Sequence, residues 1–188
     1  MANPSSLQRK PFWAPVGLAA VSALGAALVM ALLVWLLVTA KSTTVILVRD
    51  AETVSDGAAQ PVLSAEGRER AELLGRMFGD APRRDRVDAI YVLSTPAAQA
   101  TALPLAGKLG VTPVGIAPQA PRAWARRILR EHRGGRILVV APAEVARDLA
   151  AELSGVADIP PIPPTEFGSM YIVTVPRIGR ANLLSVDY

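Results

Sequence analysis

The sequence predicts an α/β domain with a largely parallel sheet, preceded by one apolar helix that is long enough to cross a membrane. Two observations carry this prediction. Residues 11–40 contain no charged side chain, whereas short β-branched runs and amphipathic helical segments alternate in the rest of the chain. Alternation of this kind is typical of layered α/β domains. The 188 residues therefore hold one domain with one appendage.

The apolar segment is long enough to span a bilayer. Residues 16–40 would form a helix of about 37 Å at 1.5 Å per residue, and a bilayer core requires about 20 residues. A cleaved secretory signal has a shorter apolar region, of about 7–15 residues, although Val38, Thr39 and Ala40 resemble a cleavage site. We therefore predict an uncleaved anchor, with a flank at 1–13, a transmembrane helix at 14–40 and a domain at 43–188.

The charges that flank this segment indicate its orientation. Arg9, Lys10 and the amino terminus precede it, whereas Lys41 and Arg49 follow it beside acidic residues. The positive-inside rule favours a cytoplasmic N-terminus. Arginine outnumbers lysine by 17 to 3 and alanine is abundant, as in proteins of GC-rich bacteria. We expect a single-pass protein of a bacterial inner membrane, with its domain on the periplasmic side.

Small residues follow one face of the apolar helix. They are Ala19, Ser22, Ala23, Ala26, Ala27 and Ala31. Stripes of small residues let two helices approach closely in lipid, so this face is a candidate contact with other membrane subunits. An alanine-rich composition would also produce such a stripe by chance, and the sequence leaves both interpretations open.

The first half of the domain contains two predicted strands and two predicted helices. Residues 44–48 (TVILV) and 88–93 (DAIYVL) are short apolar runs rich in β-branched residues, which is typical of buried strands. A helix is predicted at 64–78, with Ser64 as its N-cap. A second helix is predicted at 97–109 and ends before Gly110.

The second half continues the alternation. Helices are predicted at 122–133 and 143–153, and residues 136–140 (RILVV) read as a buried strand between them. Two final strands, at 170–175 and 181–186, flank a turn at 176–179. Because this turn is short, the last two strands should be antiparallel.

Five segments of the domain resemble the histidine phosphatase, or phosphoglycerate mutase-like, superfamily. They read TTVILVRDAET from Thr43, PVLSAEGRERAELLG from Pro61, YVLSTPAAQATALPLAGKLG from Tyr91, GGRILVVAPAE from Gly134 and EFGSMYIVTVP from Glu166. The resemblance implies a three-layer domain with a mostly parallel sheet. It also implies a phosphate pocket in which a histidine nucleophile, two arginines and a second histidine surround the phosphoryl group.

The residues at the four pocket positions depart from this pattern. Arg49 matches the first arginine, but Asp50 stands at the position of the nucleophile. Ala97 replaces the second arginine, and Pro142 occupies the position of the second histidine. A carboxylate at about 4 Å repels a unit negative charge by roughly 1 kcal/mol in water, and by more in a partly buried site. The resemblance therefore predicts a pseudoenzyme.

The remaining titratable residues offer few alternatives. The chain has no cysteine, and its one histidine, His132, follows the basic helix rather than a strand. We expect no metal and no cofactor. A second interpretation takes Asp50 as an aspartate nucleophile, supported by Ser94, Thr95 and Lys108, but only Glu144 lies near the expected acidic motif.

The helix predicted at 122–133 is strongly basic. Its residues Arg122, Arg126, Arg130 and Arg133 are spaced to share one face. Such a face suits anionic lipid headgroups or an acidic partner protein, or it is a solvated surface of an arginine-rich protein. No nucleic-acid motif accompanies it, so we expect no nucleic acid.

These observations lead to a functional prediction. We expect a non-catalytic accessory or scaffold subunit of a larger membrane protein complex. Two alternatives stay open from the sequence: a membrane-bound phosphatase with an altered active site, and a pseudophosphatase that binds an anion without hydrolysing it.

Overall fold

The fold is described from a computed structural model, which describes residues 14–38, 41–54, 62–117, 120–163 and 165–188. Within the first helix it describes side chains at positions 20–35. The chain divides into two units, Met1–Ala40 and Lys41–Tyr188. Each unit is considered by itself.

The first unit contains one helix, α1 (Ala14–Val38), whose 25 residues include no charged side chain. Within the part of the chain that the structure describes, no helix is long and apolar enough to cross a membrane. The predicted transmembrane segment therefore stays a prediction, and the predicted flank at 1–13 and residues 39–40 lie outside the described residues. Of the predicted packing face, Ser22, Ala23, Ala26, Ala27 and Ala31 are exposed on α1. The side chain of Ala19 lies outside the described part.

The second unit is built on a six-stranded sheet with the order β5-β4-β6-β1-β7-β8. The strands are β1 (Thr43–Arg49), β4 (Ala89–Leu93), β5 (Val114–Ile116), β6 (Arg136–Ala141), β7 (Ser169–Val175) and β8 (Asn182–Asp187). The first four strands run parallel to one another. β7 and β8 pair antiparallel, as predicted from their short turn.

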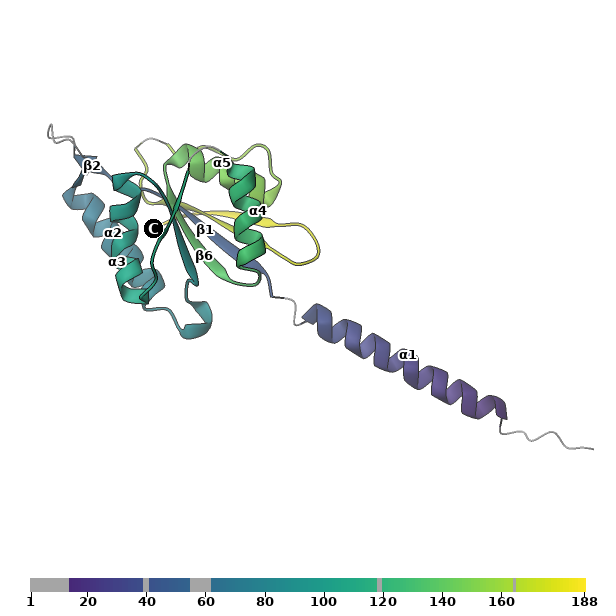
Figure 1. The fold of residues 1–188 in the computed structure, drawn as a ribbon. Coiled ribbons are helices and arrows are strands. Elements are labelled where there is room, and N and C mark those ends of the chain that lie inside the picture. The colour runs from purple at the N-terminus through teal and green to yellow at the C-terminus, as the bar shows by residue number, and fades with distance from the viewer. Residues whose placement is uncertain (1–13, 39–40, 55–61, 118–119, 164) are drawn as a thin grey trace, which may run out of the picture. The chain divides into compact units, whose positions relative to one another are not determined.

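Four helices cover the two faces of this sheet, so that the domain has three layers (Figure 1). α2 (Ala65–Gly79) and α3 (Pro96–Leu109) pack together on one face, whereas α4 (Pro121–Glu131) and α5 (Ala143–Ser154) pack on the other. The chain moves from β1 to β4 and β5, then reverses through β6 to β7. Because crossover connections between parallel strands are right-handed, this reversal moves the later helices to the opposite face.

Burial on both faces explains why the central strands read as continuous apolar runs. Every residue of β4 is buried, as are Val45–Val48 of β1 and Ile137–Ala141 of β6. Parallel strands that are covered by helices on both faces have this composition. The predicted α/β class with a mostly parallel sheet is confirmed.

Three short strands were not predicted. β2 (Thr53–Val54) and β3 (Val62–Leu63) form a separate antiparallel pair, and β5 has three residues next to Pro113. Segments of two or three residues show no hydrophobic period. A short 3₁₀ helix, η1 (Arg83–Asp85), was also not predicted.

The ends of the helices follow the capping signals. The hydroxyl of Ser64 accepts a hydrogen bond from the Gly67 amide at 2.9 Å, which caps α2. Gly110 ends α3 with φ 66°, in the left-handed region that glycine tolerates. α4 ends at Glu131, so Arg133 lies in the turn that follows the helix rather than on its face.

Candidate functional site

The predicted pocket lies where β1 and β6 end side by side. Arg49 closes β1 and pairs in register with Ala141, the last residue of β6. The Asp50 amide donates to the Ala141 carbonyl at 3.1 Å, and Pro142 comes next in the chain. The connections that leave these two neighbouring strands run in opposite directions. Such a reversal is the usual position of a binding crevice in an open α/β sheet.

A buried threonine joins the first turn of α3 to this edge. The Thr101 hydroxyl donates to the Ala97 carbonyl at 2.7 Å and accepts from the Ala51 amide at 3.0 Å. Its residue is only 1% exposed. The structure therefore brings the four predicted positions, Arg49, Asp50, Ala97 and Pro142, to one region.

The guanidinium of Arg49 is engaged by the loop before β7. Its Nη1 donates to the carbonyl oxygens of Pro163 and Glu166, each at 3.0 Å. The guanidinium carbon lies 3.9 Å from the centre of the Phe167 ring, within the range of a cation–π contact. The contacts described here thus join Arg49 to two carbonyl oxygens and an aromatic ring of this loop.

Asp50 is half-buried beside Arg49. Burial raises the pKa of its carboxyl above the usual value, because desolvation disfavours the charged form. The positive charge of Arg49 and the hydrogen bonding of the Asp50 backbone oppose this rise in pKa. At the position that the resemblance matches to the nucleophile, the structure thus has a half-buried carboxyl group rather than an imidazole.

A second polar cluster lies beside this site and was not predicted. Arg70 of α2 forms an ion pair with Glu52 at 2.7 Å, and Glu52 Oε2 is buried without a partner among the described residues. The Tyr188 amide donates to the Gly168 carbonyl at 2.7 Å. Burial raises the pKa of Tyr188 to about 12. The charge of Arg70 lowers this pKa, whereas the charge of Glu52 raises it. Sequence reasoning missed this cluster because its members come from both ends of the domain.

Other residues that the sequence singled out lie away from the pocket. His132 Nε2 is 2.9 Å from the Tyr91 hydroxyl, beyond the end of α4 and before β6 begins. Lys108, in the last turn of α3, forms an ion pair with Asp80 at 3.0 Å. Lys108 therefore binds Asp80, at the opposite end of α3 from Ser94 and Thr95. Within the described ranges, no group of three or more acidic or histidine side chains is placed to hold a metal ion.

The predicted basic face is partly compensated by acidic neighbours. Arg122 forms an ion pair with Glu152 of α5 at 2.8 Å. Arg126 and Arg130 are exposed on α4, and Arg133 is exposed in the following turn. Binding of anionic lipid or of an acidic protein by this face stays a prediction.

Comparison with solved structures shows what the arrangement of strands and helices resembles. The protein histidine phosphatase SixA, solved with tungstate, matches with a TM-score of 0.60 at 17% identity, covering 77% of this chain and 96% of SixA. The domain has the histidine phosphatase fold. A mycobacterial glucosyl-3-phosphoglycerate phosphatase matches with a TM-score of 0.57 at 14% identity, covering 76% of this chain and 97% of its own. YhfR of Bacillus stearothermophilus matches with a TM-score of 0.54 at 20% identity, covering 70% and 90%.

The histidine phosphatase fold accounts for the part of the chain that follows α1. No family model and no curated protein matches the sequence. The predicted phosphoglycerate mutase-like architecture is thus confirmed at the level of the fold. At identities of 14–20%, the similarity to these structures shows a shared fold and nothing further.

Proposed function

We propose that this protein is a membrane-anchored pseudophosphatase that serves as a non-catalytic accessory or scaffold subunit of a larger membrane protein complex. One observation carries the proposal. The end of β1, where the family nucleophile would lie, holds the carboxylate Asp50, and the adjacent Arg49 binds a loop of its own domain.

Electrostatics supports the loss of catalysis. Catalysis of phosphoryl transfer depends on positive groups that are positioned around the phosphoryl oxygens. Asp50 brings a negative charge to that place, and neither Ala97 nor Pro142 can supply a positive one. A phosphate group would also have to compete with two carbonyl oxygens for the Arg49 guanidinium.

The anchoring part of the proposal rests on the N-terminal helix. α1 has 25 residues without a charge, and its small-residue face suits close packing against another membrane helix. We place the N-terminus in the cytoplasm and the domain on the outer side of a bacterial inner membrane. The proposed partners are the bilayer and other membrane subunits.

Hydrolysis of p-nitrophenyl phosphate by the detergent-solubilised full chain tests the loss of catalysis. We expect no hydrolysis above the buffer blank, and none from Asp50→His, because Ala97 and Pro142 would still leave the site without its other positive groups. Hydrolysis by the unmodified chain that Arg49→Ala abolishes would overturn the proposal and indicate a phosphatase with an altered site.

Gentle extraction of the tagged full chain from its native membrane tests the scaffold role. We expect a defined set of membrane proteins to co-purify at constant stoichiometry. Replacing Ala23 and Ala27 by Leu should reduce this recovery if the small-residue face makes the contact, whereas Leu24→Ile should leave it unchanged. A monodisperse monomer from the unmodified chain would contradict the proposal.

A further inference from the structure

One end of the domain gathers basic residues from distant parts of the sequence. It is the end at which β1, β4 and β6 begin. The residues there, which we call the basic end, are Lys41, Arg83, Arg84, Arg86, Arg133, Arg136, Arg177 and Arg180. Lys41 precedes β1, and Arg136 begins β6. Arg83 and Arg84 belong to η1, Arg86 follows it, and Arg133 lies in the turn between α4 and β6.

The hairpin between β7 and β8 contributes the last two. Thr43 at the start of β1 pairs with Val175 at the end of β7, so the turn that follows Val175 lies at the same end of the sheet. This turn carries Arg177 and Arg180, with Ile178 between them. Ile178 is 73% exposed, so this turn presents an apolar side chain between two arginines.

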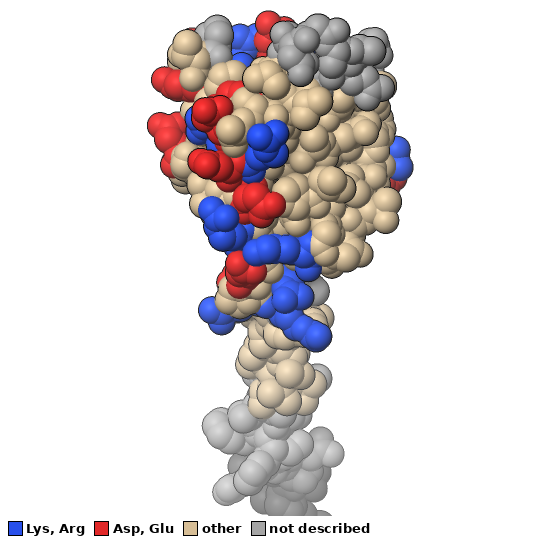
Figure 2. All heavy atoms as spheres, turned by 90° about the vertical axis from the view of Figure 1, so that its left-hand side faces the viewer, with Lys and Arg blue, Asp and Glu red and all other residues tan. Residues whose placement is uncertain are grey.

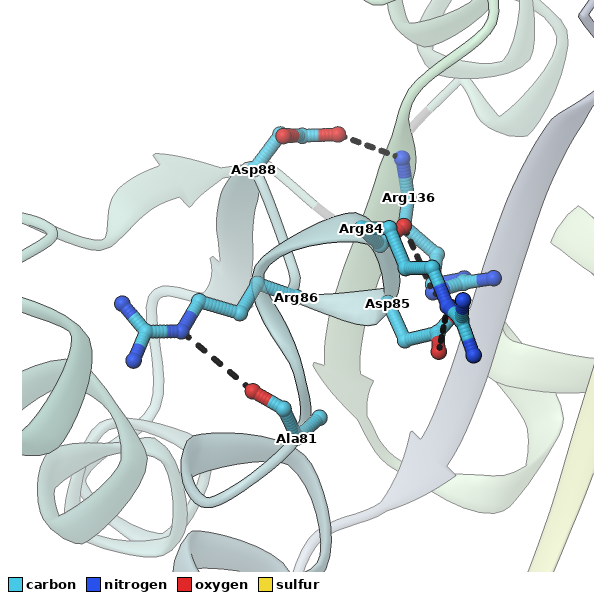
Figure 3. A network of polar contacts seen from close by, with 6 residues as sticks. All are labelled: Ala81, Arg84, Asp85, Arg86, Asp88 and Arg136. Atoms are coloured by element: carbon cyan, nitrogen blue, oxygen red, sulfur yellow. Dashed lines mark hydrogen bonds and ion pairs between the residues drawn. The ribbon is translucent and has the colours of Figure 1, made fainter.

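The acidic residues at this end do not neutralise it. Asp85 accepts from Arg136 Nη1 at 3.0 Å and from Arg84 Nε at 3.4 Å, and Asp88 accepts from the Arg136 amide at 2.7 Å (Figure 3). Among the described residues, the Arg86 side chain donates to the Ala81 carbonyl alone, at 3.4 Å. The nearby acids Asp80 and Glu131 are already paired, with Lys108 and Arg127 respectively.

Several of these cations have no partner among the residues that the structure describes. Among the described residues, no hydrogen bond or ion pair engages Arg83, Arg177 or Arg180. Figure 2 shows lysine and arginine side chains gathered along the lower edge of the domain on the face it displays. A hollow of about 250 Å³ opens among Lys41, Arg83, Arg84, Arg86 and Arg136, with Asp88 as the acidic residue of its lining. Its lining offers several cationic donors to one anionic group.

Hydrogen bonds fix the start of β1 at the basic end of the domain. The Thr44 amide donates to the Gly135 carbonyl and the Gly134 amide donates to the Thr43 hydroxyl, both at 2.9 Å. A side chain at Gly134 would lie 2.9 Å from the Cβ of Lys41, so that the backbone passes closely there. Only residues 39 and 40 separate Lys41 from Val38, the last residue of α1. Three Cα–Cα steps span at most about 11 Å.

We propose that the basic end of the domain binds the anionic headgroups of the bilayer in which α1 is anchored, with the exposed Ile178 entering the interface. This inference rests on the membrane anchoring proposed above. Basic side chains held near an anionic surface are attracted to its phosphates, and an apolar residue flanked by arginines suits the boundary between headgroups and acyl chains. The short tether keeps Lys41, at the start of the domain, within about 11 Å of the end of α1.

Depth-dependent quenching of a single label tests this contact. Because the chain has no cysteine, Pro82→Cys places one fluorophore at the basic end, and Thr165→Cys places one near the opposite end of β1. Each full-length variant is reconstituted into vesicles of phosphatidylcholine alone or with phosphatidylglycerol, each containing a nitroxide headgroup lipid. We expect the label at 82 to be quenched about twofold or more on acidic vesicles relative to neutral ones, and the label at 165 to be unaffected.

Matched charge variants assign the contact to the basic end. Replacing Arg83, Arg84 and Arg86 by Ser should abolish the extra quenching at 82. A control variant, in which Arg68, Arg122 and Arg126 become Ser, removes the same charge from other surfaces and should retain it. Raising the salt from about 0.1 M to about 1 M should have the same effect as the first variant, because the Debye length falls from about 10 Å to about 3 Å.

The remaining outcomes separate the two proposals. Full insertion of the chain without extra quenching at 82 on acidic vesicles would overturn the headgroup contact and leave the anchor intact. Failure of the chain to float with either vesicle would overturn both. A response of the label to a soluble oligonucleotide but not to acidic vesicles would assign the surface to nucleic acid and also overturn the contact.

Discussion

At the scale of single residues, Arg49 shows how one side chain can keep its place in a motif and have another use. It closes β1, at the position that the resemblance matches to the first phosphate-binding arginine. Its guanidinium nevertheless binds the carbonyls of Pro163 and Glu166 and the ring of Phe167. The residue therefore ties the loop before β7 to the end of β1.

Replacement of Arg49 by Ala should lower the free energy of unfolding by about 1–2 kcal/mol, since two charge-assisted hydrogen bonds and a cation–π contact are lost at a partly exposed site. Denaturant unfolding of the full chain in detergent measures this change. Arg49→Lys retains the charge but lacks the planar guanidinium that stacks on the Phe167 ring, so it should fall between Ala and the parent chain. Full stability of Arg49→Ala would show that the loop is held by other contacts.

Asp50 should make stability depend on pH in the opposite direction to most carboxylates. Its pKa is raised by burial, so the folded state binds its proton more tightly than the unfolded state does. Stability from this group is then present below pH 3.8 and decreases as the pH rises through the raised pKa.

Asp50→Asn should therefore be more stable than the parent chain at pH 8, because the uncharged amide avoids the cost of burying a carboxylate. The difference should disappear at pH 3.5, where the parent carboxyl is protonated. Thermal unfolding at both values compares the two, and Asp148→Asn on the exposed side of α5 provides a control. Destabilisation of Asp50→Asn at pH 8 would indicate that the ionised carboxylate is a net stabilising partner of Arg49.

At the scale of elements, α2 packs unusually closely against the segment after β1. A side chain at Gly67, in the first turn of α2, would lie 2.3 Å from the Glu52 carbonyl oxygen. The Ser64 amide donates to the same carbonyl at 2.8 Å. The backbone of Glu52 thus lies directly against the first turn of α2, and only a glycine at position 67 leaves room for its carbonyl oxygen.

Gly67→Ala should lower the free energy of unfolding by about 2 kcal/mol or more, because the helix or the 52 backbone must shift. Gly107→Ala in α3 is the matched control, since nothing lies within 4 Å of a side chain at that position. Alanine there should stabilise the protein by roughly 0.5–1 kcal/mol through helix propensity. Equal effects of the two substitutions would contradict the close approach of α2.

At the scale of the whole molecule, the chain consists of a charge-free helix and a domain with the histidine phosphatase fold. The proposed anchor and basic end would act together, because the helix would hold the domain near a bilayer and the basic end would orient it. The site at the opposite edge of the sheet, around Asp50, would then face away from the headgroups.

A charge in the middle of α1 should weaken anchoring. Leu28→Arg places an arginine near the helix centre, at an insertion cost of about 2.5–3.5 kcal/mol. We expect a smaller fraction of this variant to resist extraction with alkaline carbonate than of the parent chain. Leu103→Arg, at an exposed position of the domain, should behave like the parent chain. Complete extraction of the unmodified protein by carbonate would contradict the membrane anchor.

The sequence alone determined much of the fold, because the signals concerned are local. The buried runs at β1, β4 and β6 are apolar over consecutive residues, and Ser64 and Gly110 mark the helix ends where the structure has them. The sequence alone likewise shows that Asp50, Ala97 and Pro142 stand at the positions where the resemblance predicts other residues. The short β2, β3 and β5 were missed because two or three residues carry no period.

Only the tertiary structure decided where the charged side chains go. The turn of Arg49 toward Phe167, and the cluster of Glu52, Arg70 and Tyr188, join residues from opposite ends of the domain. The basic end likewise depends on the strand order, which sets η1, the start of β6 and the β7–β8 turn beside Lys41. Hydrophobic periodicity reports the neighbours along one segment, whereas these contacts arise from how several segments pack.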